Sequence, residues 1–270
     1  MKNKAIGVFD SGLGGLTAVK ELIKCLPNED IVYFGDTGRV PYGTRSKETI
    51  IKYAAQDARF LLSHNVKMII AACGTVSSVA GFMGKELPVK FTGVLEPTAL
   101  ACANATKTGE VAVLGTSATI NSHSYKKLLE NINPSLKVYE QDCPLFVPLV
   151  ENGFTDKDDI IVKSVVERYV SQFKNTDVDT VILGCTHYPL LKAAIGEALG
   201  NNVKLIDSGF ETALYTKKLL EENCLLADKE AEGVREFYVS DTPHNFEAVA
   251  GRFLGRNMKS TATRIDIENY

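Results

Sequence analysis

The sequence predicts an α/β protein of two similar domains, each with a mostly parallel sheet flanked by helices. Short apolar stretches alternate with longer amphipathic ones, as in folds where a helix follows each strand. Two apolar stretches, IIAAC at residues 69–73 and VILGC at residues 181–185, end in a cysteine followed by small polar residues. They lie about a hundred residues apart and indicate two halves that face each other.

The first half alternates strands and helices. We expect a strand at Ala5–Phe9, a helix at Thr17–Leu26, a strand at Ile31–Phe34, a helix at Ser46–His64 and a strand at Met68–Ala71. Pro27 ends the first helix, because proline lacks the N–H that would continue it. Ser46 is the expected N-cap of the second, since its hydroxyl can accept a free N–H of the first turn. The third strand is apolar on both faces, as parallel strands tend to be.

The second half repeats this order. We expect a strand at Val111–Leu114, a polar turn and helix in residues 115–129, a strand at Lys137–Glu140, a helix at Asp156–Phe173 and a strand at Thr180–Leu183. Acidic residues in its first turn favour the helix from Asp156, because they interact well with the helix dipole. The matching order, with little residue identity, indicates a weak internal duplication.

The rest of the chain continues the alternation. We expect a strand at Lys204–Asp207, a helix at Glu211–Glu221, a strand at Arg235–Val239, a helix at Phe246–Leu254 and a short strand in RIDI, residues 264–267. No linker rich in proline or serine separates the halves. The domain boundary is therefore expected in a short connection near Pro97.

Composition excludes several classes of protein. With 270 residues, 45% of them hydrophobic, the chain can form a full core without disulfides or metals. The net charge of −3 and the interspersed charges argue against a nucleic-acid or membrane partner. No signal-like or membrane-spanning stretch is present, so we expect a soluble, cytoplasmic protein. The six cysteines include no CxxC pair, which argues against a zinc site and for free thiols.

Cys73 and Cys185 are the candidate catalytic thiols. Each is expected at the carboxyl end of a parallel strand and at the start of a helix, where ligands gather. The free N–H groups of a helix N-terminus stabilise a thiolate, so we expect a lowered thiol pKa. His187 follows Cys185 by two residues and Asp10 ends the first strand, so each thiol has a candidate acid–base helper. Asp10 is also a candidate N-cap, and Glu151 a third acid near the cleft.

The strand-end turns also carry groups suited to a small anion. Five hydroxyls are expected there, those of Ser11, Thr75, Thr116, Thr119 and Thr186, and together they suggest a ligand with two carboxylates. The glycines of DSGLGGL allow close backbone approach to an anion, but their spacing fits neither nucleotide-binding fingerprint. RVPYG at residues 39–43 is expected to form a rigid turn with an aromatic hydroxyl.

Together, FDSGLGGL, GDTGRVPYG, the AAC that ends at Cys73, VLGTSATI and LGCTHYPLL resemble the glutamate racemases of the aspartate/glutamate racemase family over nearly the whole chain. The resemblance implies an active site in the cleft between two α/β domains, residues 1–97 plus 208–270 and residues 98–207. It also implies two-base conversion of L-glutamate to D-glutamate for peptidoglycan precursors, with no cofactor and no metal. The resemblance is also compatible with a homodimer.

Carried over residue by residue, the resemblance makes Cys73 and Cys185 the acid and base, assisted by Asp10 and His187. Cys73 would take the proton from D-glutamate and Cys185 from L-glutamate. The substrate-binding residues that it implies are Asp10, Ser11, Tyr42, Gly43, Gly74, Thr75, Thr116, Thr119, Cys185 and Thr186. The chain departs from the family at Gly74, where an asparagine is usual, so the Gly74 N–H is expected to act in place of a side-chain amide.

Two alternatives stay open at this point. One is a related enzyme, an aspartate racemase or a single-thiol decarboxylase, although the presence of both strand-end cysteines argues against the latter. The other is a protein whose two lobes bind a dicarboxylate without reacting, in which Cys73 and Cys185 could be replaced without effect. A pyridoxal-phosphate enzyme would need a Schiff-base lysine and a phosphate site, and no stretch of the chain indicates either.

Overall fold

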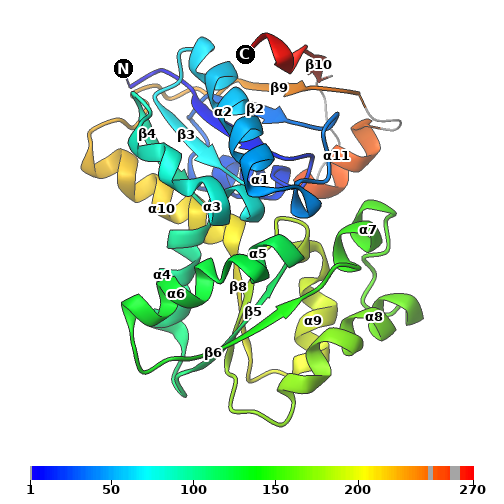
Figure 1. The fold of residues 1–270 in the computed structure, drawn as a ribbon. Helices are drawn as coiled ribbons and strands as arrows, with labels where there is room; N and C mark the ends of the chain where they lie inside the picture. Colours follow the sequence, from blue (N-terminus) through cyan, green and yellow to red (C-terminus); the bar gives the residue numbers. More distant parts are fainter. Residues whose placement is uncertain (1, 243–245, 256–261) are drawn as a thin grey trace.

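Two parallel sheets, each flanked by helices, make up the protein (Figure 1). The structure, a computed structural model, describes residues 2–242, 246–255 and 262–270. In these residues the strand order of the first sheet is β10-β9-β2-β1-β3-β4, and that of the second is β6-β5-β7-β8. All neighbouring strands are parallel. The expected fold class of two α/β domains with parallel sheets is confirmed.

The strands of the first sheet are β1 Ile6–Asp10, β2 Ile31–Gly35, β3 Met68–Ala71, β4 Lys90–Gly93, β9 Arg235–Val239 and β10 Thr263–Arg264. Those of the second are β5 Glu110–Gly115, β6 Lys137–Asp142, β7 Thr180–Leu183 and β8 Lys204–Asp207. The order β2-β1-β3-β4 has the same connectivity as β6-β5-β7-β8, which supports an internal duplication. In both sheets the second and third strands of this unit lie on opposite sides of the first, and ligands bind at such switch points.

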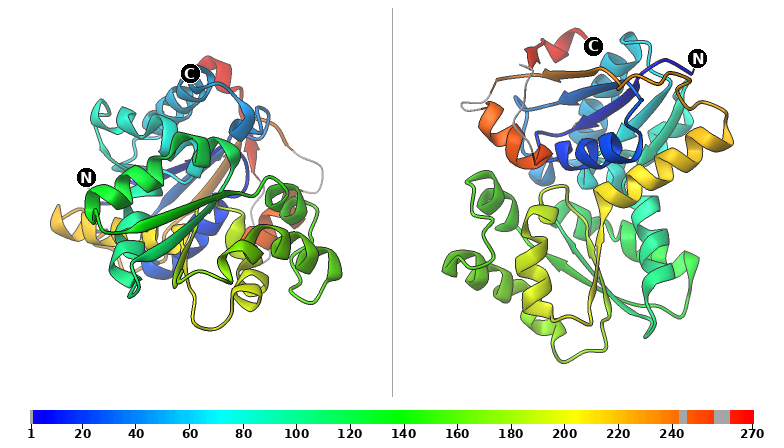
Figure 2. Two further views of the ribbon diagram at one scale, coloured as in Figure 1. Left: turned by 60° about the horizontal axis from the view of Figure 1, so that its bottom comes forward. Right: turned by 180° about the vertical axis from the view of Figure 1, so that it is seen from behind.

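Helices cover both faces of the first sheet. On one face lie α1 Leu16–Cys25, α10 Ser208–Glu222 and α11 Phe246–Leu254, and on the other α2 Lys47–Ser63 and α3 Gly74–Ala80. Seen from behind, α11, α1 and α10 form a row on the side turned toward the second sheet (Figure 2). Side chains alternate along each strand, so Ile6 and Val8 join the core beneath α1, whereas Phe9 joins the core beneath α2.

The helices around the second sheet are α4 Leu95–Ala105, α5 Ser117–Ser122, α6 Ser124–Ile132, α7 Phe146–Glu151, α8 Ile160–Val170 and α9 Lys192–Leu199. Short 3-10 helices are η1 Tyr42–Thr44, η2 Gly81–Lys85, η3 Ser171–Phe173, η4 Tyr188–Leu191 and η5 Ile267–Asn269. The chain crosses between the domains twice, through α4 and from β8 into α10, and these two helices pack together on one side of the molecule (Figure 1).

Several elements differ from those expected. The helix expected from Asp156 begins at Ile160, because Asp159 caps it by accepting the N–H groups of Ile161 and Val162. The helix expected within residues 115–129 is divided into α5 and α6 at His123, whose φ of 53° is left-handed. Of RIDI, only its first residue is in a strand.

The elements β4, α4 and α7 were not expected, and for α3 and α9 only a helix start, at Cys73 and at Cys185, was expected. They are short or lack a clear apolar period. Pro97, where we expect the domain boundary, lies in the first turn of α4, a position that proline tolerates. Within the described residues, no helix has the length and apolarity that a membrane crossing requires.

Candidate active site

A pocket of about 360 Å³ lies between the carboxyl ends of the two sheets. Turns after β1, β3, β5 and β7 form its walls, together with the segment after β2 and part of α7. The expected site residues that line it are Asp10, Ser11, Tyr42, Gly43, Cys73, Gly74, Thr75, Thr116, Glu151, Cys185, Thr186 and His187. Thr119 does not line the pocket, but its hydroxyl lies 3.0 Å from that of Thr116, which does. Most of the residues named from the sequence therefore lie around one cavity.

Cys73 is the N-cap residue of α3 and is almost fully buried. Its Sγ donates to the hydroxyl of Ser11, 3.5 Å away. Burial, followed by the charge of Asp10, raises the pKa of the Cys73 thiol to about 12. The expectation of a lowered pKa is wrong here, because burial outweighs the stabilising contacts with Ser11 and the Val76 N–H. In this state Cys73 is a protonated thiol, a form suited to an acid.

Asp10 ends β1 and organises the turn that follows. Its Oδ2 accepts the N–H groups of Gly12 and Gly15 at 3.1 and 3.0 Å. Gly15 immediately precedes α1, so Asp10 stabilises the start of this helix, as an N-cap would. Burial raises the pKa of Asp10, although the charge of His187 and three backbone N–H groups act in the opposite direction. The charge of Asp10 in turn contributes to the raised pKa of the Cys73 thiol.

Cys185 and His187 lie together after β7. The Sγ of Cys185 is 3.8 Å from Nδ1 of His187, and Nε2 of His187 is 3.2 Å from Oε1 of Glu151. Burial alone lowers the pKa of His187, but hydrogen bonds to Cys185 and Glu151 and the charges of Cys185 and Asp10 raise it to about 10. His187 is therefore an imidazolium at neutral pH. The ring of Phe253 in α11 packs edge-on against it at 5.1 Å between centroids.

The turn after Cys185 differs from the expected helix start. It leads into the 3-10 helix η4, and the α-helix α9 begins only at Lys192. The group beside the Cys185 sulfur is thus an imidazole rather than the N-terminus of an α-helix. The second partner of this imidazole is Glu151, the third acid expected near the cleft, and only the fold brings it to His187.

A line of hydroxyls crosses from one domain to the other. Oγ1 of Thr75 lies 3.2 Å from Oγ1 of Thr116, which lies 3.0 Å from Oγ1 of Thr119. Thr116 also accepts the Thr119 N–H as the N-cap of α5. On the other side of the pocket, the Thr17 hydroxyl donates to the Thr186 carbonyl at 2.9 Å. The Thr75–Thr116 and Thr17–Thr186 contacts both join the two domains beside the cavity.

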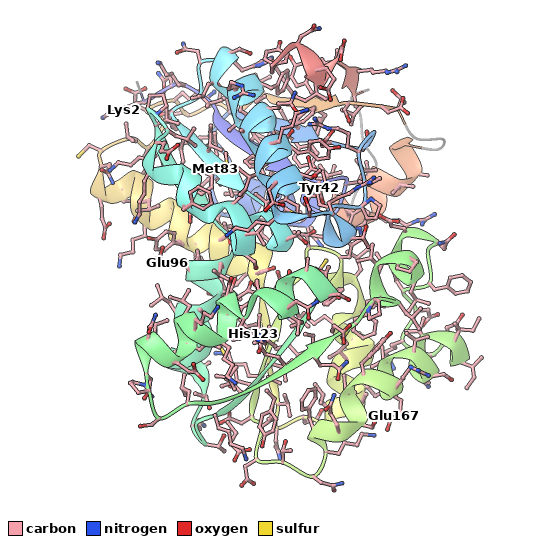
Figure 3. The ribbon with its side chains drawn as sticks, viewed as in Figure 1. Lys2, Tyr42, Met83, Glu96, His123 and Glu167 are labelled. Carbon is pink, nitrogen blue, oxygen red and sulfur yellow. The ribbon has the colours of Figure 1, made fainter. Side chains whose placement is uncertain are left out.

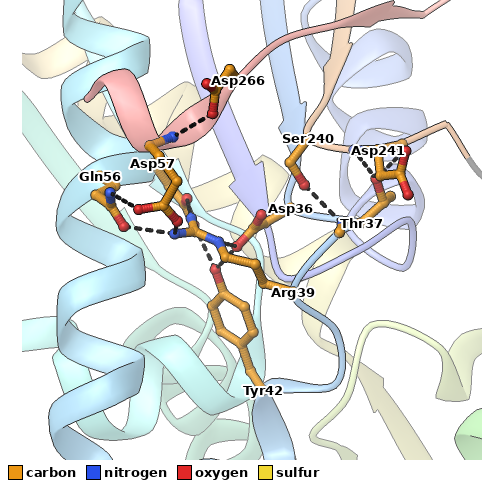
Figure 4. Close-up of polar contacts among 11 residues, drawn as sticks. Asp36, Thr37, Arg39, Tyr42, Gln56, Asp57, Ser240, Asp241 and Asp266 are labelled. Carbon is orange, nitrogen blue, oxygen red and sulfur yellow. Dashed lines mark hydrogen bonds and ion pairs between the residues drawn. The ribbon is translucent and has the colours of Figure 1, made fainter.

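Tyr42 lines the pocket with its ring but directs its hydroxyl away from it. The hydroxyl donates to Asp36 and lies 3.1 Å from Oδ2 of Asp57, both buried (Figure 4). Arg39 donates to these two carboxylates, at 2.6 Å to Asp36 and 3.1 Å to Asp57. Tyr42 lies at the edge of the first domain that faces the second (Figure 3). The network therefore anchors a wall of the pocket.

Asp57 belongs to this network but is not among the residues named from the sequence. Its only signal was a carboxylate on the apolar face of α2, three residues after Ala54 and three before Phe60. Such a residue needs a partner when it is buried, and Arg39 is that partner. Among the described residues, no group of three or more His, Cys, Asp or Glu side chains has an arrangement that could hold a metal ion.

Comparisons with known proteins by family model, by sequence and by structure agree with one another. A model of the Asp/Glu/Hydantoin racemase family matches residues 13–214. The chain is 47% identical over 253 residues to a glutamate racemase of Geobacter metallireducens, covering 93% of each protein. It superposes on the glutamate racemase of Francisella tularensis, solved with D-glutamate, with a TM-score of 0.93 at 41% identity and complete coverage of both chains. The enzyme of Thermus thermophilus, solved with β-chloro-D-alanine, gives 0.88 at 39% identity, with 100% of this chain and 99% of that one covered.

Proposed function

The chain belongs to the Asp/Glu/Hydantoin racemase family, and we propose that it interconverts L-glutamate and D-glutamate without a cofactor. One observation carries the proposal: two thiols line a single pocket from opposite domains, each at the end of the third strand of its duplicated unit. Racemisation requires a base on one face of the α-carbon and an acid on the other. Two opposed sulfurs meet that requirement.

The two thiols are not equivalent in the free protein. In the proposed reaction Cys185 acts first as the base, with the imidazolium of His187 as the counter-ion of its sulfur, whereas the raised pKa keeps Cys73 protonated. Cys185 takes the α-proton of L-glutamate as the C–H bond breaks and an S–H bond forms. Cys73 delivers its own proton to the opposite face, which gives D-glutamate and a Cys73 thiolate. The reverse reaction starts from that second state.

The α-proton is very weakly acidic, so the developing charge on the substrate must be stabilised. Ser11, Thr75 and Thr186 line the pocket, and their hydroxyls, together with the N–H groups of the strand-end turns, are the donors proposed to bind the carboxylates. Such donors, held in place before the reaction, stabilise the developing charge most strongly in a site that excludes water. Asp10 and His187 act as helpers of Cys73 and Cys185 through charge and hydrogen bonding.

The same proposal includes a domain division and a cellular role. Residues 1–97 with 208–270 would form one domain, and residues 98–207 the other, a division supported by the membership of the two sheets. The product D-glutamate would supply peptidoglycan precursors in the cytoplasm. A homodimer is testable by light scattering of the purified protein.

The test is incubation of the reduced protein with L-glutamate in D2O, without added cofactor. We expect loss of the α-proton signal in NMR together with loss of optical rotation. Retention of both, while glutamate demonstrably binds, would support the dicarboxylate-binding alternative instead. A parallel incubation with L-aspartate separates glutamate from aspartate as the substrate.

A further inference from the structure

The turn that carries Cys185 is built from hydrogen bonds between residues three apart. The Tyr188 N–H donates to the Cys185 carbonyl at 3.0 Å. The Leu190 N–H donates to the His187 carbonyl at 3.1 Å. Thr186 lies between these two acceptors, so the same 3-10 pattern calls for a third bond, to the Thr186 carbonyl.

That third bond cannot form within the turn. Its donor would be residue 189, which is a proline in the first turn of η4 and has no N–H. Thr186 is only 3% exposed, so water has little access to it. A buried carbonyl without a donor is costly. The Thr186 carbonyl therefore needs a donor from outside its own turn.

Thr17 of the first domain supplies this donor. It lies in the first turn of α1, the helix that follows the turn held by Asp10, and it is buried. Its hydroxyl oxygen lies 2.9 Å from the Thr186 carbonyl oxygen. In residues 2–242, 246–255 and 262–270, no other group donates a hydrogen bond to that oxygen. A turn of the second domain thus depends on a hydroxyl of the first.

The Thr17 hydroxyl also has an acceptor in its own domain, the Gly14 carbonyl, at 2.9 Å. A hydroxyl has one proton to donate, so the two carbonyls compete for it. The Gly14 carbonyl does not depend on this proton, because it already accepts the Thr17 N–H at 3.0 Å. The Thr186 carbonyl has no such second donor in the described part of the chain. Donation across the domain boundary is therefore favoured.

We infer that Thr17 is a positioning residue for Cys185: its hydroxyl holds the Thr186 carbonyl across the domain boundary and so fixes the turn that carries the Cys185 sulfur. The inference rests on the proposed racemisation, in which Cys185 takes the α-proton of L-glutamate and Cys73 that of D-glutamate. Without the hydroxyl, the turn of Cys185 loses a restraint, whereas the turn of Cys73 keeps its contacts. Misplacement of a reacting group by about 1 Å can slow a reaction by about 10²-fold.

The consequence is an asymmetry between the two proton transfers. If transfer at Cys185 becomes slower, it limits the rate in both directions of the reaction. A deuterium on the α-carbon of L-glutamate then moves in the slow step, so its isotope effect on kcat/KM rises. A deuterium on D-glutamate moves to Cys73 in the faster step, so its isotope effect falls. A mere loss of stability would lower the amount of active enzyme and leave both isotope effects unchanged.

The experiment measures Thr17→Val with L- and D-glutamate deuterated at the α-carbon. Valine has nearly the same shape as threonine but no hydroxyl. We expect kcat/KM for racemisation to fall about 10- to 100-fold, with a larger isotope effect for L-glutamate and a smaller one for D-glutamate. Thr17→Ser keeps the hydroxyl and should restore the wild-type values.

The matched control is Thr212→Val. Thr212 is fully buried in α10, and its hydroxyl donates to the Ser208 carbonyl of its own helix at 2.6 Å. The variant removes an equally buried hydroxyl that makes no bridge between the domains. It should keep the wild-type rate and both isotope effects.

Pro189→Ala tests the origin of the missing donor. The N–H of an alanine at residue 189 can complete the 3-10 pattern and donate to the Thr186 carbonyl. Adding Pro189→Ala to Thr17→Val should therefore recover most of the lost rate and bring both isotope effects back toward the wild-type values. If Thr17→Val alone does not fold, the double variant should fold and racemise glutamate for the same reason. A double variant that stays unfolded or inactive overturns the inference.

The outcomes separate the two proposals. If the wild type neither exchanges the α-proton of glutamate nor racemises it, the proposed function fails. If the wild type is active and Thr17→Val keeps the wild-type rate, the positioning role of Thr17 is wrong. That role is equally wrong if Thr17→Val is slower but both isotope effects stay unchanged.

Discussion

Nδ1 of His187 lies 3.8 Å from the sulfur of Cys185, while Nε2 of the same ring lies 3.2 Å from a carboxylate oxygen of Glu151. The imidazole therefore joins a buried sulfur to an acid at the pocket wall. Because both neighbours favour its charged form, the pKa of His187 rises to about 10 in spite of burial. The asymmetry between Cys185 and Cys73 depends on this pair.

Replacing Glu151 should move the pH dependence of the reaction. Glu151→Gln replaces a carboxylate that raises the pKa of His187 with a neutral amide, so that pKa falls below about 10. We expect the alkaline limb of kcat/KM for L-glutamate to shift to lower pH. At neutral pH the loss should stay within about tenfold, since the Glu151 side chain is 53% exposed and solvent screens its charge.

The control is Glu197→Gln, which removes a carboxylate that is 51% exposed and paired with Lys157. It should leave the pH profile unchanged. An alkaline limb that stays in place in Glu151→Gln would show that this carboxylate does not influence the His187 proton.

Single replacements of the two thiols should separate the two half-reactions. Cys73→Ser should exchange the α-proton of L-glutamate for deuterium but not that of D-glutamate, and Cys185→Ser should do the reverse, because each thiolate reaches one face. Racemisation should fall by about 10²–10⁴-fold in both. D-Glutamate should still raise the unfolding temperature of each variant. Cys224→Ser, which changes an exposed thiol, is the control; full racemisation by either pocket variant would contradict the two-base mechanism.

Thr116 should affect both substrate affinity and stability. Thr116→Val removes the acceptor of the Thr119 N–H and the contact with Thr75. We expect a higher KM for glutamate and a loss of about 1 kcal/mol in the free energy of unfolding, the usual value of an N-cap. Thr116→Ser keeps the hydroxyl and should restore both quantities. Equal behaviour of the two variants in kinetics and urea unfolding would disprove this role.

Replacing Arg39 should lower the free energy of unfolding far more than replacing Asp57. Arg39→Met leaves the buried carboxylates of Asp36 and Asp57 without their cation and should cost about 3–5 kcal/mol. Asp57→Asn should cost far less. Burial, followed by the charge of Asp36, raises the pKa of Asp57 well above 3.8, so the fold favours the neutral form of this group, and a neutral amide is a closer replacement for it than for an ordinary carboxylate.

The sign of the pH dependence follows from that shift. Since the folded pKa of Asp57 exceeds the unfolded value, the folded protein holds the extra proton, and the stability from this group is lost as pH rises from 3.8 through the folded pKa. The free energy of unfolding of the wild type, measured with urea, should therefore fall with rising pH relative to that of Asp57→Asn. Parallel pH profiles for the two proteins would contradict a raised pKa.

The sequence by itself determined most of the strands, several of the helices and the positions of both cysteines at strand ends. Met68–Ala71, Thr180–Leu183 and Lys204–Asp207 form strands with the expected bounds, because an apolar run bounded by turn residues is a local signal. Parallel pairing then brings the strand ends of each sheet to one edge, and the resemblance to a two-domain family places the two edges at one cleft. That is why Asp10, Cys73, Thr116 and Cys185 could be grouped from sequence alone.

Only the tertiary structure decided how these groups behave. The pKa of Cys73 depends on how completely the closed cleft buries it, and the charge of His187 depends on Glu151, thirty-six residues away in the chain. Asp57 meets Arg39 only when α2 packs on the first sheet, and Thr17 meets Thr186 only when the domains close. Burial and distances between remote residues belong to the packed molecule, and no local pattern of residues encodes them.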